Sequence, residues 1–400
     1  MAVRLPLAPY ACDAANSRGR MFEEEPSRTR SAFQRDRDRI LHSTAFRRLA
    51  HKTQVFVPLD GDHFRTRLTH TIEVGQIARA LARALALDED LAEAVALAHD
   101  LGHTPFGHAG EDMLTACMAQ YGGFDHNAQA LRIVTKLERR YAQYDGLDLC
   151  WETLEGLVKH NGPLKGPRAT RPLPPYIAEF DALFPLELEL FAGAEAQCAS
   201  LADDIAYNAH DIDDGLRAGL FDIEDIARVP FIGALRDEVE SLYSGLEWTR
   251  TIHEIVRRVI TRFVEDVIDE SSARLAKAAP RSAQDIRLLA GPMVGFSPAM
   301  EEAERGVKEF LYANMYRHPR MMVERDRACE AIAYLFPVYM EKPGLMPQEW
   351  AAQASRGGDD ARAHVVADYI AGMTDRYALG EYAQLSGKTV DLWRAASGEG

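Results

Sequence analysis

Cysteine is scarce in this chain. Its 400 residues include five cysteines, which are widely spaced and form no CxxC pair: Cys12, Cys117, Cys150, Cys198 and Cys329. This excludes a disulfide-rich scaffold, a zinc ribbon and a dithiol redox motif. Isolated thiols fit a protein that works in a reducing compartment.

Long hydrophobic runs are also missing. No stretch approaches the roughly 18 consecutive apolar residues of a membrane-spanning helix. Segment 1–20 lacks an uninterrupted apolar core followed by a cleavage site, which argues against a secretory signal. With 47% hydrophobic and 27% charged residues, the composition is that of an ordinary globular protein. We therefore expect a cytoplasmic protein with a sizeable core.

The chain has fewer basic residues than acidic ones, 46 against 61. The net charge of −15 excludes a chain that coats nucleic acid through bulk charge. One stretch departs from this balance and contains Arg28, Arg30, Arg35, Arg37, Arg39, Arg47, Arg48 and Lys52. It is either a solvated helix face with i,i+4 ion pairs or a surface for phosphates, from a polyanionic substrate or single-stranded nucleic acid.

Alternating strand patterns are rare, and helical periodicity dominates. Apolar residues recur near the helical period over 68–85 and again over 91–98. Asp88 is predicted to cap the second of these helices, and Gly102 and Pro105 are predicted to end it.

The remaining chain is also predicted to be mostly helical. Longer helices are expected over about 187–218 and 246–278, with Pro/Gly-rich breaks at 161–175 and 278–300. We expect an all-α protein built around one compact core. Its predicted parts are a basic N-terminal segment, a central core and a C-terminal helical region packed on that core: 1–45, 46–240 and 241–400.

Histidines gather in one part of the chain. Of the 13 histidines, several follow one another between positions 70 and 126: His70, His99, His103, His108 and His126. Asp100 directly follows His99, so on a helix the two side chains diverge by about 100°. They can face one ion only where the helix ends, and Gly102 makes such an end plausible. Imidazole nitrogens and carboxylate oxygens suit a divalent metal that activates water, which predicts a metal-dependent hydrolase.

A second acidic element lies further along. Asp203, Tyr207 and Asp211 are spaced by four residues, which places them on one helix face. Asp203 would reach the metal, and the other two would continue the stripe into a neighbouring pocket. A solvated acidic face is the alternative, supported by Asp204 and the pair at 213–214. The preference for Asp203 over Asp204 as the ligand depends on the step to Tyr207.

The sequence resembles a known family. His70, the pair His99–Asp100 and Asp203 match the H…HD…D pattern of HD-domain metal phosphohydrolases. Longer segments extend the match to the deoxynucleoside triphosphate triphosphohydrolases, in their dGTPase-like branch. These segments are RRLAHKTQVF (47–56), RTRLTHTIEV (65–74), AHDLGHTPFGHAGE (98–111), FDHNAQALRI (124–133), VKHNGP (158–163), ADDIAYNAHDIDD (202–214) and YIAGMTDRYAL (369–379). The resemblance implies an all-α HD-domain fold, its core at 46–240, with a C-terminal helical extension.

The resemblance also implies an activity. Such enzymes hydrolyse a dNTP to the deoxynucleoside and intact tripolyphosphate. One divalent metal, Mn or Mg and sometimes Fe, would be held by His70, His99, Asp100 and Asp203. The family forms homo-oligomers, tetramers or hexamers, and regulation by a second dNTP or by single-stranded DNA is a further expectation.

The same match assigns roles around the metal. His108 would be catalytic, with Glu111 as its acidic partner. Other matched residues would bind the substrate, at the phosphates or at the deoxyribose: Arg67, His103 and His126, then Gln54, Tyr207 and Asp211. Glu111 lies three residues after His108, close enough to fix its tautomer, and an arginine fork suits phosphate oxygens.

Two further segments can be interpreted in several ways. Tyr312 and Tyr316 in LYANMYRHP (311–319) could close a nucleotide pocket, contact another subunit or simply end a helix. Lys159 and His160 could reach substrate phosphates or belong to a helix C-terminus.

Other functions stay open. Another HD phosphohydrolase, such as a nucleotide phosphatase or a cyclic-nucleotide phosphodiesterase, would use His103 and His126 for a second metal. A nucleotide sensor or single-stranded DNA binder would use the basic stretch 28–52. A third possibility is an enzyme whose assembly responds to nucleotide or DNA at a second site.

Overall fold

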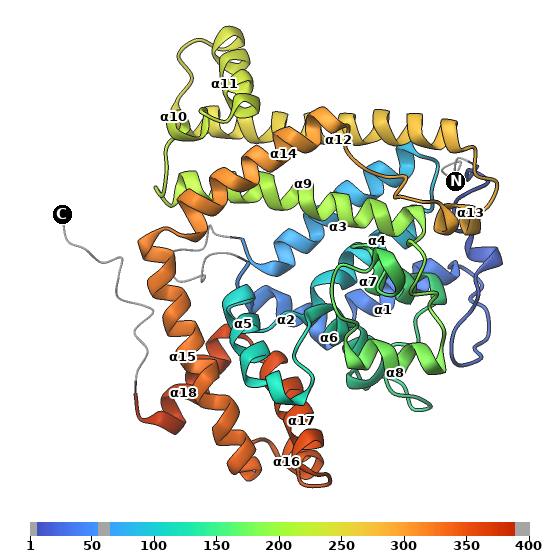
Figure 1. The fold of residues 1–400 in the computed structure, drawn as a ribbon, viewed down its shortest axis with the longest axis vertical. Helices are drawn as coiled ribbons and strands as arrows, with labels where there is room; N and C mark the ends of the chain where they lie inside the picture. Colours follow the sequence, from blue (N-terminus) through green and yellow to red (C-terminus); the bar gives the residue numbers. More distant parts are fainter. Residues whose placement is uncertain (1–5, 55–64, 389–400) are drawn as a thin grey trace.

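The part of the protein that the structure describes is mostly helical. The computed structural model describes residues 6–54 and 65–388 (Figure 1). Across these two ranges there is no strand, only the isolated bridges Thr53–Thr66 and Arg139–Gly146. The all-α prediction is confirmed. No helix in the same ranges is both long and apolar enough to cross a bilayer.

Eighteen α-helices follow one another along the described chain. The first eight are α1 (Ala32–Leu41), α2 (Thr44–Arg48), α3 (Arg67–Ala84), α4 (Glu89–Ala98), α5 (Gly107–Cys117), α6 (His126–Arg132), α7 (Trp151–Lys159) and α8 (Pro175–Leu183). The next five are α9 (Ala194–Arg217), α10 (Ile223–Ile226), α11 (Pro230–Leu242), α12 (Trp248–Ala278) and α13 (Ala283–Leu288). The last five are α14 (Pro298–Leu311), α15 (Pro319–Glu341), α16 (Gln348–Ala354), α17 (Asp359–Ala371) and α18 (Asp375–Ser386).

Most predicted helix ends match the structure. The Asp88 side chain caps α4 by accepting hydrogen bonds from the backbone N–H groups of Asp90 and Leu91. The prediction for 187–218 begins too early, because α9 starts at Ala194. Glu187 has φ = +54°, a left-handed conformation that a right-handed helix cannot contain. The last two residues of the quoted segment 47–56 lie outside the described ranges.

Helix α4 is enclosed on both faces. Leu91 and Val95 belong to a hydrophobic cluster shared with α3 and α9. Ala94 and Leu97 belong to a second cluster, shared with α2, α6, α7 and α8. A helix that is apolar all round is a core helix. The residues that follow its C-terminal end therefore lie in the interior of the protein.

Three hydrophobic clusters hold the helices together. The cluster of α3, α4 and α9 also includes α11, α12 and α14, so helices on both sides of residue 240 contribute to it. A third cluster joins α5 to α15, α16, α17 and α18. In Figure 1 these last helices lie at the opposite end of the molecule from α11 and α12. The division at 45 and 240 stays a prediction.

Gly102 lets α6 approach the end of α4. The short 3₁₀ turn η3 (His99–Gly102) continues α4 and packs on α6. A Cβ atom on Gly102 would lie 1.9 Å from the carbonyl oxygen of His126 and 2.4 Å from the amide nitrogen of Ala130. Both contacts are with backbone, so no side-chain rotation relieves them. Only glycine fits there without moving α6.

We predict that Gly102→Ala destabilises the protein by about 1–3 kcal/mol or more, because overpacking against backbone displaces a helix. Gly380→Ala is the matched control, since a Cβ at this helical position meets nothing within 4 Å. The control should be neutral or stabilise slightly. Thermal and urea unfolding measure both variants. Equal stability of Gly102→Ala and wild type would contradict the close approach of α6.

Candidate metal centre and histidine cluster

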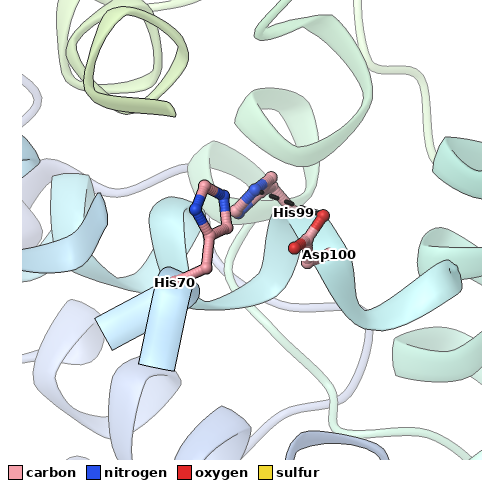
Figure 2. A group of neighbouring side chains, drawn as sticks. All are labelled: His70, His99 and Asp100. Carbon is pink, nitrogen blue, oxygen red and sulfur yellow. Dashed lines mark ion pairs between the residues drawn. The ribbon is translucent and has the colours of Figure 1, made fainter. Parts of the chain in front are cut away.

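Three buried side chains meet inside the molecule (Figure 2). His70 comes from α3, whereas His99 and Asp100 come from η3. One ligand atom from each lies within 4.8 Å of those of the other two. His99 Nε2 is 3.4 Å from Asp100 Oδ1, so sequence neighbours face a common point.

Asp203 joins this group from α9. Its Oδ1 is 2.8 Å from His70 Nε2 and 3.5 Å from His99 Nε2. The Asp203 side chain is 38% exposed, so the group is open to solvent on this side. Asp204 instead turns to the Lys308 ammonium, at 2.8 Å. The structure brings Asp203, and not Asp204, to the histidines.

The unpaired atoms and charges of the group fit a cation. Within residues 6–54 and 65–388, His99 Nε2 and Asp100 Oδ2 are buried and find no hydrogen-bond partner. Burial alone lowers the pKa of His99, but the carboxylates of Asp100 and Asp203 more than offset it and raise that pKa to about 9. Burial opposes ionisation of Asp100, yet Arg67 and His99 hold its pKa well below the usual range. Two imidazoles and two carboxylates could hold a divalent metal such as Mn, Mg or Fe.

A second histidine supports His70 from behind. His70 Nδ1 is 3.2 Å from His210 Nδ1, and His210 Nε2 makes an ion-pair contact with Glu73. His70 Nε2 can face a cation only without a proton, so its proton belongs on Nδ1, directed at His210. His210 then carries its own proton on Nε2, directed at Glu73. Glu73 and His210 thus set the tautomer of His70.

His210 and Glu73 were not predicted from the sequence, although their helical spacing from Asp203 and His70 could have indicated them. His210 follows Asp203 by seven residues, about two helical turns, and Glu73 follows His70 by three. These spacings place His210 on the same face of its helix as Asp203, and Glu73 on the same face as His70. The helical periodicity that selected Asp203, Tyr207 and Asp211 also applies here.

A second group of titratable side chains begins at Asp100. His103 Nε2 is 3.2 Å from Asp100 Oδ1, and the His103 ring stacks on His126 with centroids 4.2 Å apart. Glu111 on α5 joins the rings, with carboxylate oxygens 2.7 Å from His126 Nδ1 and 3.4 Å from His108 Nδ1. Burial opposes ionisation of Glu111, but hydrogen bonds from His108 and His126 hold its pKa well below the usual range. The anionic Glu111 therefore orients two imidazoles.

Arg67 and His108 differ in their exposure to solvent. Arg67 begins α3, is 2% exposed, and places Nη1 2.9 Å from Asp100 Oδ1. Its Nε is buried, and no described residue forms a hydrogen bond with it. His108 lies in the first turn of α5, and its side chain is 64% exposed.

Tyr207 and Asp211 continue along α9 beyond Asp203. The Tyr207 ring is nearly parallel to that of Tyr316, with planes 6° apart and centroids separated by 6.2 Å. The Tyr316 hydroxyl donates a hydrogen bond to the Asp211 carboxylate. Burial, followed by the charge of Asp214, raises the pKa of Asp211 well above the usual range. Tyr316 thus connects the C-terminal helices to the predicted sugar-binding residues.

Gln54 lies near the same place. It lines a cavity of about 120 Å³ together with His108 and Tyr316. Its Oε1 atom is buried and has no hydrogen-bond partner among the residues that the structure describes. The cavity therefore combines a residue predicted to bind the sugar with the residue predicted to be catalytic. The functional roles of all these residues stay predictions.

Lys159 and His160 are adjacent in sequence but lie in different surroundings. Lys159 is fully buried, and its ammonium lies 3.0 Å from Glu155 and donates to the carbonyl oxygen of Glu187. The Lys159 ammonium is paired inside the core, so the suggestion that it reaches phosphates is not supported. The His160 ring, by contrast, lies 6.4 Å from the His99 ring.

Much of the basic stretch is paired with acidic groups. Arg37 contacts Asp90 at 2.8 Å, and Arg39 binds Glu24. Arg30 and Arg35 also form ion pairs with carboxylates. Lys52 is buried, where its ammonium donates to the carbonyl oxygens of His103 and Ala371. These side chains therefore stabilise the fold, mostly through partners distant in the chain and not through the expected i,i+4 pairs.

Comparison with known proteins finds two matching domains in this chain. Residues 67–208 match the HD domain, and residues 294–384 match the phosphohydrolase-associated domain. A deoxyguanosinetriphosphate triphosphohydrolase-like protein of Brucella ovis is 59% identical over 388 residues, 96% of each chain. Similarly named proteins of Mesorhizobium japonicum and Parvibaculum lavamentivorans are 57% and 56% identical, over 97% and 94% of this chain.

The helical fold, with a His-Asp pair at the end of a buried helix, is that of an HD-domain phosphohydrolase. Within this class, the chain belongs to the family of deoxyguanosinetriphosphate triphosphohydrolase-like proteins.

We predict that His210→Ala weakens Mn²⁺ binding about 10- to 100-fold, because loss of an outer partner leaves the His70 ring without a fixed tautomer. Glu73→Gln should act in the same direction with a smaller effect. His253→Ala, at an exposed histidine on α12, is the control. Isothermal titration or Mn²⁺ electron paramagnetic resonance measures the affinity. An affinity unchanged in His210→Ala would show that the His70–His210 contact does not support metal binding.

Proposed function

We propose that the protein is a metal-dependent hydrolase that converts a dNTP to its deoxynucleoside and tripolyphosphate. The observation that supports this is the continuity of the two clusters through Asp100. This carboxylate contacts His99 in the candidate metal group and His103 in the group that ends at His108. A single substrate phosphate can therefore reach both groups at once.

In this proposal one dication, Mn or Mg with Fe as an alternative, is held by His70, His99, Asp100 and Asp203. Such a cation supplies Lewis acidity, which eases deprotonation of water and polarises a phosphate oxygen.

Three cationic or N–H-bearing side chains bind the phosphates. Arg67 neutralises charge deep in the site, where its burial strengthens the interaction. His103 and His126 present stacked rings along the path between Asp100 and His108. They line the path of the triphosphate and keep it aligned.

His108 carries the proton in the proposed reaction. Its Nδ1 faces Glu111, so its Nε2 is free to face the substrate. Cleavage of the bond between the α-phosphorus and the 5′-oxygen leaves an alkoxide that needs a proton. His108 Nε2 donates that proton, and the Glu111 carboxylate stabilises the protonated imidazole beforehand.

The deoxyribose would lie against α9. Tyr207 offers a ring face on which a deoxyribose packs and a 2′-hydroxyl finds no room. Asp211 and Gln54 hydrogen-bond the 3′-hydroxyl. We also propose that the protein forms a homo-oligomer, a tetramer or hexamer, and that a dNTP or single-stranded DNA regulates it.

A second candidate is another HD phosphohydrolase with two metals. His103, Glu111 and His126 place one ligand atom each within 4.8 Å of the others, which is compatible with a second cation. In that case the same residues would hold a metal instead of moving a proton. A nucleotide phosphatase or phosphodiesterase would then be the better description.

We expect a panel of four dNTPs and four NTPs, assayed with Mn²⁺ or Mg²⁺, to give tripolyphosphate from dNTPs and little product from NTPs. Ion chromatography identifies the product. Orthophosphate or pyrophosphate would favour the second candidate. Equal rates on ribonucleotides and deoxyribonucleotides would contradict the sugar pocket.

His108→Ala should lower turnover by at least about 100-fold while the metal content stays at the wild-type level, since His108 lies outside the metal group. His51→Ala, at an exposed histidine, is the control. Steady-state kinetics and elemental analysis measure the two effects. Turnover similar to wild type would remove His108 from the mechanism.

A further inference from the structure

The turn that presents His108 has a strained backbone. Residues 103–106 connect η3 to α5, and Phe106 has φ = +64°, a left-handed conformation unfavourable for a bulky residue. Gly107 follows with φ = +57°. Such a conformation persists only where surrounding contacts hold it, and it clusters at functional sites. The contacts that hold this turn are therefore informative.

The turn is held by Asp375, from α18 near the other end of the chain. Asp375 Oδ1 accepts a hydrogen bond from the backbone N–H of Phe106 at 2.9 Å. Its Oδ2 accepts from the backbone N–H of Thr53 at 2.7 Å and also from the Thr53 hydroxyl. Thr53 directly precedes Gln54. One carboxylate thus fixes two segments, and each carries a residue of the proposed site.

The position of Asp375 in its own helix does not explain these contacts. An aspartate in the first turn of a helix commonly caps it or stabilises its positive end. Here the cap is Thr374, whose side chain accepts from the Tyr377 backbone N–H. Both Asp375 oxygens point away from α18, and the residue is only 5% exposed. A buried carboxylate that uses both oxygens outside its own helix acts on those outside segments.

Lys52 makes a parallel connection at the other end of the turn. Its ammonium donates to the carbonyl oxygen of His103 and to that of Ala371, the last residue of α17. The turn is therefore tied to the C-terminal helices both at His103 and at Phe106. The turn belongs to the segment that matches the HD domain, whereas α17 and α18 belong to the segment that matches the phosphohydrolase-associated domain.

We infer that Asp375 is a positioning residue: through Phe106 and Thr53, the phosphohydrolase-associated segment sets the orientation of His108 and Gln54. This inference rests on the proposed function. His108 sits two residues after Phe106, so rotation of the turn moves its ring directly. The metal group is tied to α3, η3 and α9 and stays in place. Loss of Asp375 therefore impairs turnover and leaves metal binding intact.

The test uses Asp375→Asn in the full-length protein. Asparagine keeps the size, but its amide nitrogen cannot accept a hydrogen bond, so either Phe106 or Thr53 loses its partner. We expect kcat to fall about 10- to 100-fold, as for a misplaced catalytic group, with a smaller rise in KM from the displaced Gln54 and unchanged metal content. Amide hydrogen exchange in segment 101–112 should become faster, while exchange in α3 and α9 should not. Asp360→Asn, at an exposed position in α17, is the matched control.

Thr53→Val provides a second variant that removes one hydroxyl and leaves Asp375 in place. It should lower kcat and speed exchange at 101–112 in the same direction, less than Asp375→Asn does. Faster exchange throughout the chain in both variants, with loss of metal, would mean a general structural role and overturn the inference. Wild-type kcat and exchange in both variants would overturn it as well. The exchange measurement needs no substrate, so it tests the inference even if the chain does not hydrolyse dNTPs.

Discussion

The carboxylate of Asp100 is the contact on which the site depends. It lies at the end of a helix enclosed on both faces, and burial of a charge without partners is strongly unfavourable. Arg67, His99 and His103 surround it and keep it ionised. The same carboxylate thereby connects a group suited to a cation with a group suited to proton transfer. Removal of Asp100 would separate the two and leave Arg67 unpaired in the interior.

The packing explains why the site lies where it does. Helices α3 and α9 belong to one hydrophobic cluster with α4, and they bring His70 and Asp203 to its end. Helix α5 belongs to a different cluster, with α15 to α18, and it carries His108 and Glu111. The site therefore lies where separate cores meet. This is the physical reason why residues of the C-terminal helices, such as Tyr316 and Asp375, contact it.

Much of this arrangement could be predicted from the sequence, and the remainder could not for identifiable reasons. Helical periodicity identified α3 and α4, the Asp88 cap and the shared face of Asp203, Tyr207 and Asp211. Motif resemblance supplied the other candidate residues. The start of α9 was misjudged because nothing in the sequence around Glu187 signals its left-handed backbone. The partners of Lys52 and Asp375 are distant in sequence, and no local pattern reports a contact between such segments.

The central claim is that four side chains from three parts of the chain share one cation. The most direct measurement is a crystal structure of the protein soaked with Mn²⁺, with anomalous diffraction used to locate the metal. We predict one strong anomalous peak within bonding distance of His70, His99, Asp100 and Asp203, with Asp204 still on Lys308. A peak only between His103, Glu111 and His126, or no ordered metal at saturating Mn²⁺, would contradict this account.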